Sequence, residues 1–295
     1  MGILGEEDVV ATESVKHWNR YRTGNLTRRF FLHLVLIILG LSMVFPLVWM
    51  IFSSFKPSLE VISTDFHLFP KTWTLRNYVR VFDEVTMGRG YLNSLIMSGF
   101  VTFFVLLSAT AGGYLFAKLK FRGRDTLFFV VLGSVMVPPQ IVLIPLYILM
   151  SRFGWINSYQ GLIFPFIMNA FGIFLMRQSM YGIPNDLLEA ARMDGATDWR
   201  IYYSVILPLV RSSIAVLGIL VFLWTWDEFL WPLVTVASNE MKTLPLLMAH
   251  FTQAEQKFPG ESLAASTLVI GPVLVVYAFF QQHFVRGLSM TGLKG

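Results

Sequence analysis

Uncharged apolar runs of membrane-spanning length decide what this chain can fold into. A helix needs about 20 apolar residues to cross a bilayer, because no unpaired backbone group can face lipid. Five runs reach that length without Lys, Arg, Asp or Glu, namely 30–55, 91–117, 126–151, 153–176 and 262–285. A sixth run, about 205–226, carries Arg211 near one end, where the long side chain can reach the headgroups. We therefore predict an all-α integral membrane protein with six transmembrane helices.

The composition supports this class and excludes others. The chain of 295 residues is 55% hydrophobic and 14% charged, unlike an ordinary soluble domain. It has no cysteine, so disulfide frameworks, thiolate metal sites and cysteine nucleophiles are excluded. Its net charge of +5 is better explained by basic residues beside helix ends than by nucleic-acid binding.

The distribution of Lys and Arg predicts the orientation. Six crossings place both termini on one side of the membrane. Residues 1–29 contribute five basic residues to that side, the link after the second span four, the link after the fourth span four and the C-terminal residues two. The resulting fifteen compare with eight on the other side. Both termini are therefore expected in the cytoplasm, with residues 1–29 as a polar cytoplasmic tail.

The cytoplasmic segment 183–208 is predicted to form a helix–turn–helix hairpin. Pro184 suits a helix start, and Gly195 supplies a left-handed end to the first helix. Thr197 is a good cap for a second helix, which Pro208 is expected to end.

The first helix of this hairpin has a narrow apolar surface made by Leu187, Ala190, Ala191 and Met193. Charged residues flank the surface, so it would fit a groove in another protein. A helix that lies on the headgroups and links two spans would show the same pattern. The spacing of these residues alone leaves both interpretations open.

Several motifs in this chain resemble those of one transporter family. Glu189-Ala190-Ala191, Asp194-Gly195 and Ile206-Leu207-Pro208 resemble, in sequence and spacing, the EAA loop of binding-protein-dependent ABC importer permeases. Further stretches are similar to the carbohydrate branch, specifically the smaller permease of the maltose-type sugar transporters. These stretches are 74–78, 93–95, 136–140, 144–147, 229–233, 284–288 and the terminal Lys294-Gly295. One departure is Asp227, where the family more often has asparagine.

The resemblance implies that residues 30–295 form an ABC importer transmembrane domain in a bacterial or archaeal cytoplasmic (inner) membrane. Its EAA loop would be a coupling helix that docks on an ATPase through Glu189, Ala190, Ala191, Asp194 and Gly195. Further implied partners are a second homologous permease, or a second copy, and an extracytoplasmic sugar-binding protein. Two ATPase subunits would bind ATP and Mg and drive alternating access. The chain itself has no Gly-Lys dipeptide for a P-loop, so it is expected to be a transporter subunit without enzymatic activity or cofactor.

Two groups of residues are candidates for the sugar path. The cluster of Trp224, Trp226, Asp227 and Glu228 combines aromatic faces with carboxylates, as sugar sites do. An interfacial aromatic belt with solvated carboxylates would have the same composition.

Gln140 and Asn169 are the second group, because both are polar at or near membrane depth. Gln140 follows Pro138 and Pro139, which must interrupt the third span and free backbone carbonyls. Either residue could line a path, or it could satisfy local hydrogen bonds at a kink.

Two other function classes are alternatives. An ion-coupled secondary transporter normally needs ionisable groups near the bilayer midplane, whereas Asp227 and Glu228 lie at a span edge. An intramembrane enzyme would need a nucleophile with a base or a set of metal ligands. The sequence offers neither, and the five histidines lie far apart along the chain.

Overall fold

The computed structural model describes the backbone of residues 7–253 and 258–289, and the side chains of 28–251 and 258–279. Within these ranges every regular element is helical and no strand occurs, as predicted. The helices are α1 (Glu7–Ser53), α2 (Ser58–Val61), α3 (Arg76–Glu84), α4 (Met87–Lys118), α5 (Arg124–Ser134), α6 (Pro139–Arg152), α7 (Tyr159–Ile163), α8 (Ala170–Tyr181), α9 (Asn185–Met193), α10 (Asp198–Ile201), α11 (Leu207–Leu209), α12 (Arg211–Trp226), α13 (Leu230–Thr235), α14 (Leu244–Gln253) and α15 (Pro259–Ser289).

Three continuous helices in the described part are long and apolar enough to cross a membrane. They are Arg28–Ser53 within α1, the whole of α4 and Pro259–Phe279 within α15. Three further stretches have the required length only as bent pairs. These pairs are α5 with α6 (95°), Tyr159–Phe166 with α8 (43°), and Asp198–Leu209 with α12 (78°). If each pair is one span, the described chain crosses up to six times.

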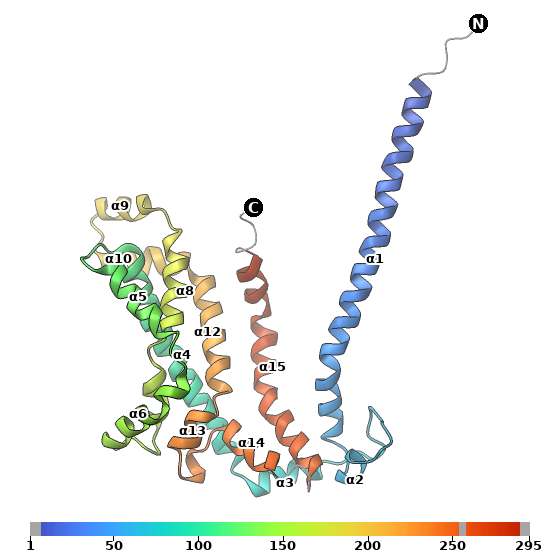
Figure 1. Cartoon of the computed structure of the whole chain (residues 1–295), viewed down its shortest axis with the longest axis vertical. Helices are drawn as coiled ribbons and strands as arrows, with labels where there is room; N and C mark the ends of the chain where they lie inside the picture. The colour runs from blue at the N-terminus through green and yellow to red at the C-terminus, as the bar shows by residue number, and fades with distance from the viewer. Residues whose placement is uncertain (1–6, 254–257, 290–295) are drawn as a thin grey trace.

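The sharpest bend lies at Pro138 and Pro139, where the sequence predicts an interruption. Proline has no N–H to donate within a helix, and its ring clashes with the preceding turn. The helix α5 accordingly ends at Ser134, and Pro138 has extended backbone angles (φ −60°, ψ 131°) before α6 begins. Because the two helices meet at 95°, the run 126–151 is not one straight span (Figure 1).

The fourth span begins later than the apolar run 153–176 suggests. Gly154 and Asn157 have positive φ values of 70° and 56°, so the chain turns there instead of starting a helix. Ser158 then caps α7 by accepting a backbone N–H of its first turn. After a 43° bend, α8 extends to Tyr181, which lies beyond the predicted end.

The fifth span bends at Val210, two residues after the proline expected to break it. A π-helical turn, Tyr202–Ile206, precedes Pro208, and the N–H of Leu207 there bonds to the Tyr202 carbonyl. This wider turn accommodates a proline, which cannot donate to the carbonyl four residues back. The predicted span 205–226 is therefore a straight helix only from Arg211 onward.

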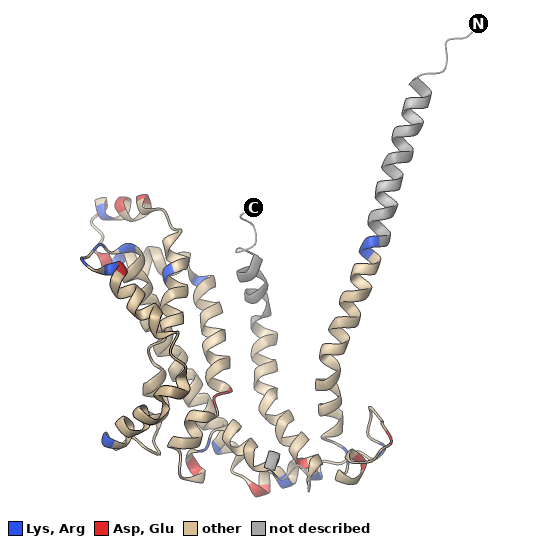
Figure 2. Cartoon of the chain, in the orientation of Figure 1, with Lys and Arg blue, Asp and Glu red and all other residues tan. Residues whose placement is uncertain are grey.

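The two ends of the bundle carry different elements. The helix α9 lies at the same end as the first turn of α1 and the last turn of α15, and α2, α3 and α14 lie at the opposite end (Figure 1). Charged residues gather at these two ends and are sparse between them (Figure 2). The helix α1 continues through 7–29, the segment predicted as a tail. The side chains of 1–27 and 284–288 and the terminal Lys294-Gly295 lie outside the described residues.

The main core forms where α4 packs along α8 and α12. Gly113 of α4 lies so close to α8 that an added Cβ would be 2.6 Å from the Met176 Cβ and 2.9 Å from the Arg177 amide. Val105 and Leu217 are fully buried in the same core. Small residues at such a crossing let the two backbones approach closely. By contrast, apolar side chains of α1 between Phe30 and Phe45 are exposed in the single chain.

Candidate functional site

The segment 183–208 begins with the predicted hairpin. The helix α9 starts after Pro184, and Gly195 ends the turn that follows it with a φ of 79°. A side chain at that angle would strain the backbone, so glycine suits the position. Thr197 then caps α10 by accepting the Arg200 N–H, as predicted.

One side of this hairpin is fixed to the bundle. Leu188 is 2% exposed and packs into the main core. Lys118, the last residue of α4, donates to the Ile183 carbonyl over 2.6 Å and to Asn185 Oδ1 over 3.1 Å. The N-cap position of α9 is Pro184, so the helix starts without a side-chain cap. The hydrogen bonds of Lys118 attach the link between α8 and α9 to the end of α4.

The other side of the hairpin is open. Four of the five predicted coupling residues, Glu189, Ala190, Asp194 and Gly195, are exposed, whereas Ala191 is half-buried. A partner could therefore reach the two ends of α9 and its outer face without displacing the core.

The apolar surface expected from spacing is arranged differently. Leu187 and Met193 project outward and are 47% and 88% exposed. Leu188, which the expected surface does not include, is the residue that faces the bundle, and Ala191 lies partly against the same core. The outer face of α9 is thus apolar at both ends and small at Ala190.

Arg177 of α8 joins three helices near this hairpin. Its guanidinium carbon lies 3.9 Å from the centroid of the Phe128 ring in α5. Its Nε donates to the Phe116 carbonyl of α4 over 3.3 Å, and its Nη2 lies 3.5 Å from Asp125 Oδ1. A cation–π contact of this kind contributes about 0.5–2 kcal/mol. The sequence indicated only that Arg177 lies near a helix end.

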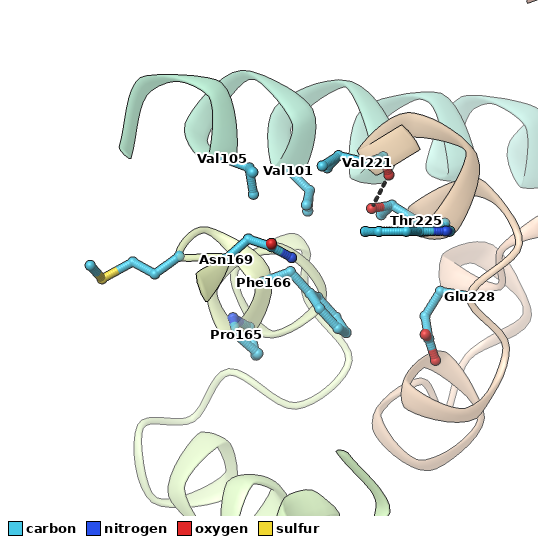
Figure 3. A pocket seen from close by; sticks show the side chains of 10 residues that line it. Val101, Val105, Pro165, Phe166, Asn169, Val221, Thr225 and Glu228 are labelled. Atoms are coloured by element: carbon cyan, nitrogen blue, oxygen red, sulfur yellow. Dashed lines mark hydrogen bonds between the residues drawn. The ribbon is translucent and has the colours of Figure 1, made fainter. Parts of the chain in front are cut away.

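A cavity of about 190 Å³ lies where α4, α12 and the break before α8 meet (Figure 3). Small-molecule sites are usually about 300–1,000 Å³, so this volume suits one wall of a larger site. The lining residues are Val101, Val105, Pro165, Phe166, Met168, Asn169, Val221, Trp224, Thr225 and Glu228. The cavity therefore has apolar walls with a few polar groups.

Three of the six predicted path residues line this cavity. Asn169 is the N-cap of α8, and its Oδ1 accepts the Gly172 N–H over 2.7 Å. Trp224 is exposed, and its ring packs edge-on against Phe171 with 5.5 Å between centroids. Glu228 is half-buried and accepts the Trp231 N–H over 3.0 Å. Figure 3 shows Asn169 and Glu228 entering the cavity from different segments.

The other three path candidates lie elsewhere. Gln140 is exposed on α6. Trp226 is 1% exposed and donates from Nε1 to the Val269 carbonyl, inside a second core with α14 and α15. Asp227 is exposed at the end of α12. Trp224 and Trp226 diverge because residues two apart on a helix point to different faces.

The apolar residues that line the cavity were not predicted from the sequence. Val101 and Val105 stand one helical turn apart on α4, and Pro165, Phe166 and Met168 precede the break before α8. In a chain so rich in apolar residues, nothing distinguishes these five from core residues. Pro165 was the available signal, since it marks irregular backbone inside a predicted span.

Residues 105–290 match the family described as "Binding-protein-dependent transport system inner membrane component". The chain belongs to this family. The match includes the hairpin and every cavity-lining residue except Val101. As an inner membrane component of this kind, the chain is a multi-pass membrane protein, and the resemblance seen in the EAA motif is confirmed at the level of the family.

Several curated relatives of this inner membrane component are named as permeases for sugars. The arabinooligosaccharides transport system permease protein AraQ of Halalkalibacterium halodurans is 36% identical, over 85% of this chain and 91% of that protein. The diacetylchitobiose uptake system permease protein NgcG of Streptomyces coelicolor is 31% identical, over 87% and 86%. The trehalose/maltose transport system permease protein MalG of Thermococcus litoralis is 30% identical, over 91% and 98%. The chain is thus a carbohydrate ABC importer permease.

Two solved structures share the fold of this inner membrane component. One is a bacterial ABC transporter involved in the import of the acidic polysaccharide alginate, with a TM-score of 0.76 and 22% identity, covering 96% of this chain and all of that one. The other is a bacterial alginate ABC transporter in complex with an alginate pentasaccharide-bound periplasmic protein, with a TM-score of 0.56 and 16% identity, covering 91% and 94%. Both comparisons concern the fold alone.

The named relatives of this inner membrane component and its potential metal ligands bear on its class. In the described ranges no group of three or more His, Cys, Asp or Glu side chains could hold a metal ion. The relatives are named as permeases, in line with the prediction of a non-enzymatic subunit. What the site can do is hold a polar ligand against an apolar wall and present a short helix to a partner.

Proposed function

We propose that this protein is a permease subunit of an ATP-driven importer that moves a carbohydrate into the cytoplasm by alternating access. The hairpin of α9 and α10 is the observation that carries the proposal. Leu188 and Lys118 attach it to the core, while Glu189 and Ala190 are exposed. A helix held in this way can transmit the movement of a docked partner to the helices behind it.

The docked partner in this proposal is an ATPase subunit, and two such subunits serve one importer. Glu189, Ala190, Ala191, Asp194 and Gly195 would enter a groove on the ATPase, with Glu189 paired to a basic residue there. ATP and Mg would be bound entirely by the ATPase subunits. The absence of a Gly-Lys dipeptide from this sequence supports that division of roles.

A second, homologous permease would complete the pathway. The exposed apolar faces of α1 and α6 and the small volume of the cavity support this, because both leave the single chain incomplete. An extracytoplasmic sugar-binding protein would deliver the substrate, as the complex of the alginate transporter with its periplasmic protein suggests.

The proposed orientation places α9 and both termini in the cytoplasm of a bacterium or archaeon, with six crossings of the inner membrane. The location of α9, the first turn of α1 and the last turn of α15 at one end of the bundle supports it (Figure 1). The excess of Lys and Arg on the same side supports it independently.

The cavity formed by Asn169, Trp224 and Glu228 is proposed as part of the sugar path. An aromatic face, an amide and a carboxylate are the groups with which proteins hold sugar rings. The relatives whose names specify arabinooligosaccharides, diacetylchitobiose and trehalose/maltose support a short carbohydrate as substrate.

Co-purification and transport test this function together. The tagged chain is purified in mild detergent from its own cells, and the co-eluting proteins are identified by mass spectrometry. The complex is then reconstituted with its binding protein, and uptake of radiolabelled arabinotriose, maltose and diacetylchitobiose is measured with and without ATP. We expect a second permease, a P-loop ATPase and ATP-dependent uptake. Uptake by the chain alone, driven by a proton or sodium gradient, would instead establish an ion-coupled secondary transporter.

A further inference from the structure

The side chains that line the cavity carry negative charge and no positive charge. Of its ten lining residues only Glu228 is charged, and none is Lys, Arg or His. The basic residues that the structure describes gather at the two ends of the bundle (Figure 2). An anionic ligand in this cavity would therefore meet a carboxylate and no neutralising cation from this chain. Burying like charges together without a counter-ion is strongly unfavourable.

The polar groups of the cavity match a neutral ring with several hydroxyls. The Oδ1 atom of Asn169 is already engaged by the first turn of α8, so its Nδ2 is left to donate. One oxygen of Glu228 accepts the Trp231 N–H, and the other can accept from a ligand hydroxyl. Thr225 donates to the Val221 carbonyl over 2.8 Å, which leaves its oxygen as an acceptor. The free groups are thus acceptors on Glu228 and Thr225 and donors on Asn169 and the Trp224 indole, a mixture that hydroxyls match because each hydroxyl both donates and accepts.

The aromatic wall points to the same ligand. Trp224 is 51% exposed, and the edge-on contact with Phe171 holds its ring in place. An indole face of this kind can cover the C–H face of a pyranose ring through apolar contact.

The N-terminus of α8 acts against this preference for a neutral ligand. A helix start carries about half a positive charge, which would favour an anion. The Asn169 side chain already satisfies one of the free amides there. The remaining partial charge is smaller than the full negative charge of Glu228, so the net preference of this wall is against anions.

We propose that this cavity selects neutral sugar rings, and that Glu228 sets the selectivity by accepting ring hydroxyls and repelling the carboxylates of uronic acids. The inference deepens the proposed function and rests on it. The preference it predicts is for neutral sugars, whereas a solved transporter that shares the fold is described as involved in the import of the acidic polysaccharide alginate.

A matched pair of ligands tests the proposal directly. Binding to the purified complete transporter is followed by saturation-transfer difference NMR, which detects weak ligands without the binding protein. The probes are methyl β-glucoside and methyl β-galactoside, each compared with the corresponding methyl uronoside, which differs only by a carboxylate at C6. The variants are Glu228→Gln, which keeps an acceptor for the Trp231 N–H but removes the charge, and Glu240→Gln, the same change at an exposed position.

For the wild type we expect signals from the neutral glycosides that are about tenfold stronger than those from the uronosides, as a free-energy difference of about 1.4 kcal/mol would give. In Glu228→Gln the uronoside signal should rise and the ratio approach one, while Glu240→Gln should keep the wild-type ratio. Equal signals in the wild type, an unchanged ratio in Glu228→Gln, or no binding of either probe would overturn the proposal. The proposed function fails separately, if the purified chain lacks an ATPase partner.

Discussion

Arg80 of α3 and Glu261 of α15 form an ion pair of 2.6 Å between residues 181 positions apart. The Glu261 side chain is 2% exposed, and its second oxygen accepts the Ser58 hydroxyl over 3.0 Å. Nearby, Asn77 donates to the carbonyls of Ser54 and Lys56, each over 2.8 Å. These contacts attach the end of α1 to the bundle at the end opposite α9.

Replacement of Arg80 by methionine should destabilise the protein, because it leaves the buried Glu261 carboxylate without its counter-ion. A fully buried pair broken in this way costs about 3–5 kcal/mol, and partial exposure of Arg80 reduces the expected loss to about 1–3 kcal/mol. Thermal unfolding in detergent measures it. The control is Asp65→Asn, which removes an exposed pair at 4.0 Å and should change little. Equal shifts in both variants would contradict the structural role of Arg80.

Gly113→Ala should loosen the packing of α4 on α8. The added methyl group would meet Met176 at 2.6 Å and backbone atoms at 2.9 Å, and backbone cannot move aside cheaply. Overpacking of this kind costs about 1–3 kcal/mol. Gly99→Ala on the same helix is the matched control, since its Cβ would have no neighbour within 4 Å. The unfolding temperatures of the two variants give the comparison, and a smaller effect at Gly113 than at Gly99 would refute the prediction.

Two substitutions separate the roles of Asn169. Asn169→Ala removes the cap of α8 and should lower the free energy of unfolding by about 1 kcal/mol. Asn169→Ser keeps a capping oxygen but loses the amide donor, so stability should stay within about 0.5 kcal/mol while sugar uptake falls. Unfolding and uptake are measured on the same preparations. Full uptake by the serine variant would show that the amide does not contact the substrate.

Glu189→Ala and Gly195→Ala should weaken coupling to the ATPase without preventing membrane insertion. Glu189 is exposed, so its removal affects a docked partner and leaves the core intact. At Gly195 the methyl group would strain a φ of 79° by about 1–2 kcal/mol and turn α9 away from its position. Sugar-stimulated ATP hydrolysis reports the effect, with the exposed Lys120→Met as control. Unimpaired hydrolysis and uptake in both variants would remove the basis for the docking assignment.

Local chemistry made some features predictable from the sequence. The left-handed turn at Gly195, the cap at Thr197 and the interruption at Pro138 each depend on the backbone preferences of one or two residues. The number of apolar runs also gave the possible crossings, because a bilayer requires a fixed length of apolar helix.

The features that the sequence did not predict depend on tertiary contacts. An apolar run does not reveal where a helix begins inside it, so the turn at Gly154 and Asn157 was not foreseen. Leu188, and not the regular surface around Ala190, attaches α9 to the core. Trp224 and Trp226 are the same residue type two positions apart, so the sequence does not distinguish them. Trp226 is buried because it packs against α15.

The helix α4 is unbroken over 32 residues, which corresponds to about 48 Å. Val101 and Val105 of the cavity stand near its middle, and the hairpin is attached to its last residue, Lys118. In the proposed alternating access, such a helix would act as a lever arm. If it pivots at its first turn, a tilt of about 5° over that length moves Lys118 by about 4 Å and the cavity wall by about 2 Å. In such a movement the hairpin is therefore displaced about twice as far as the cavity wall.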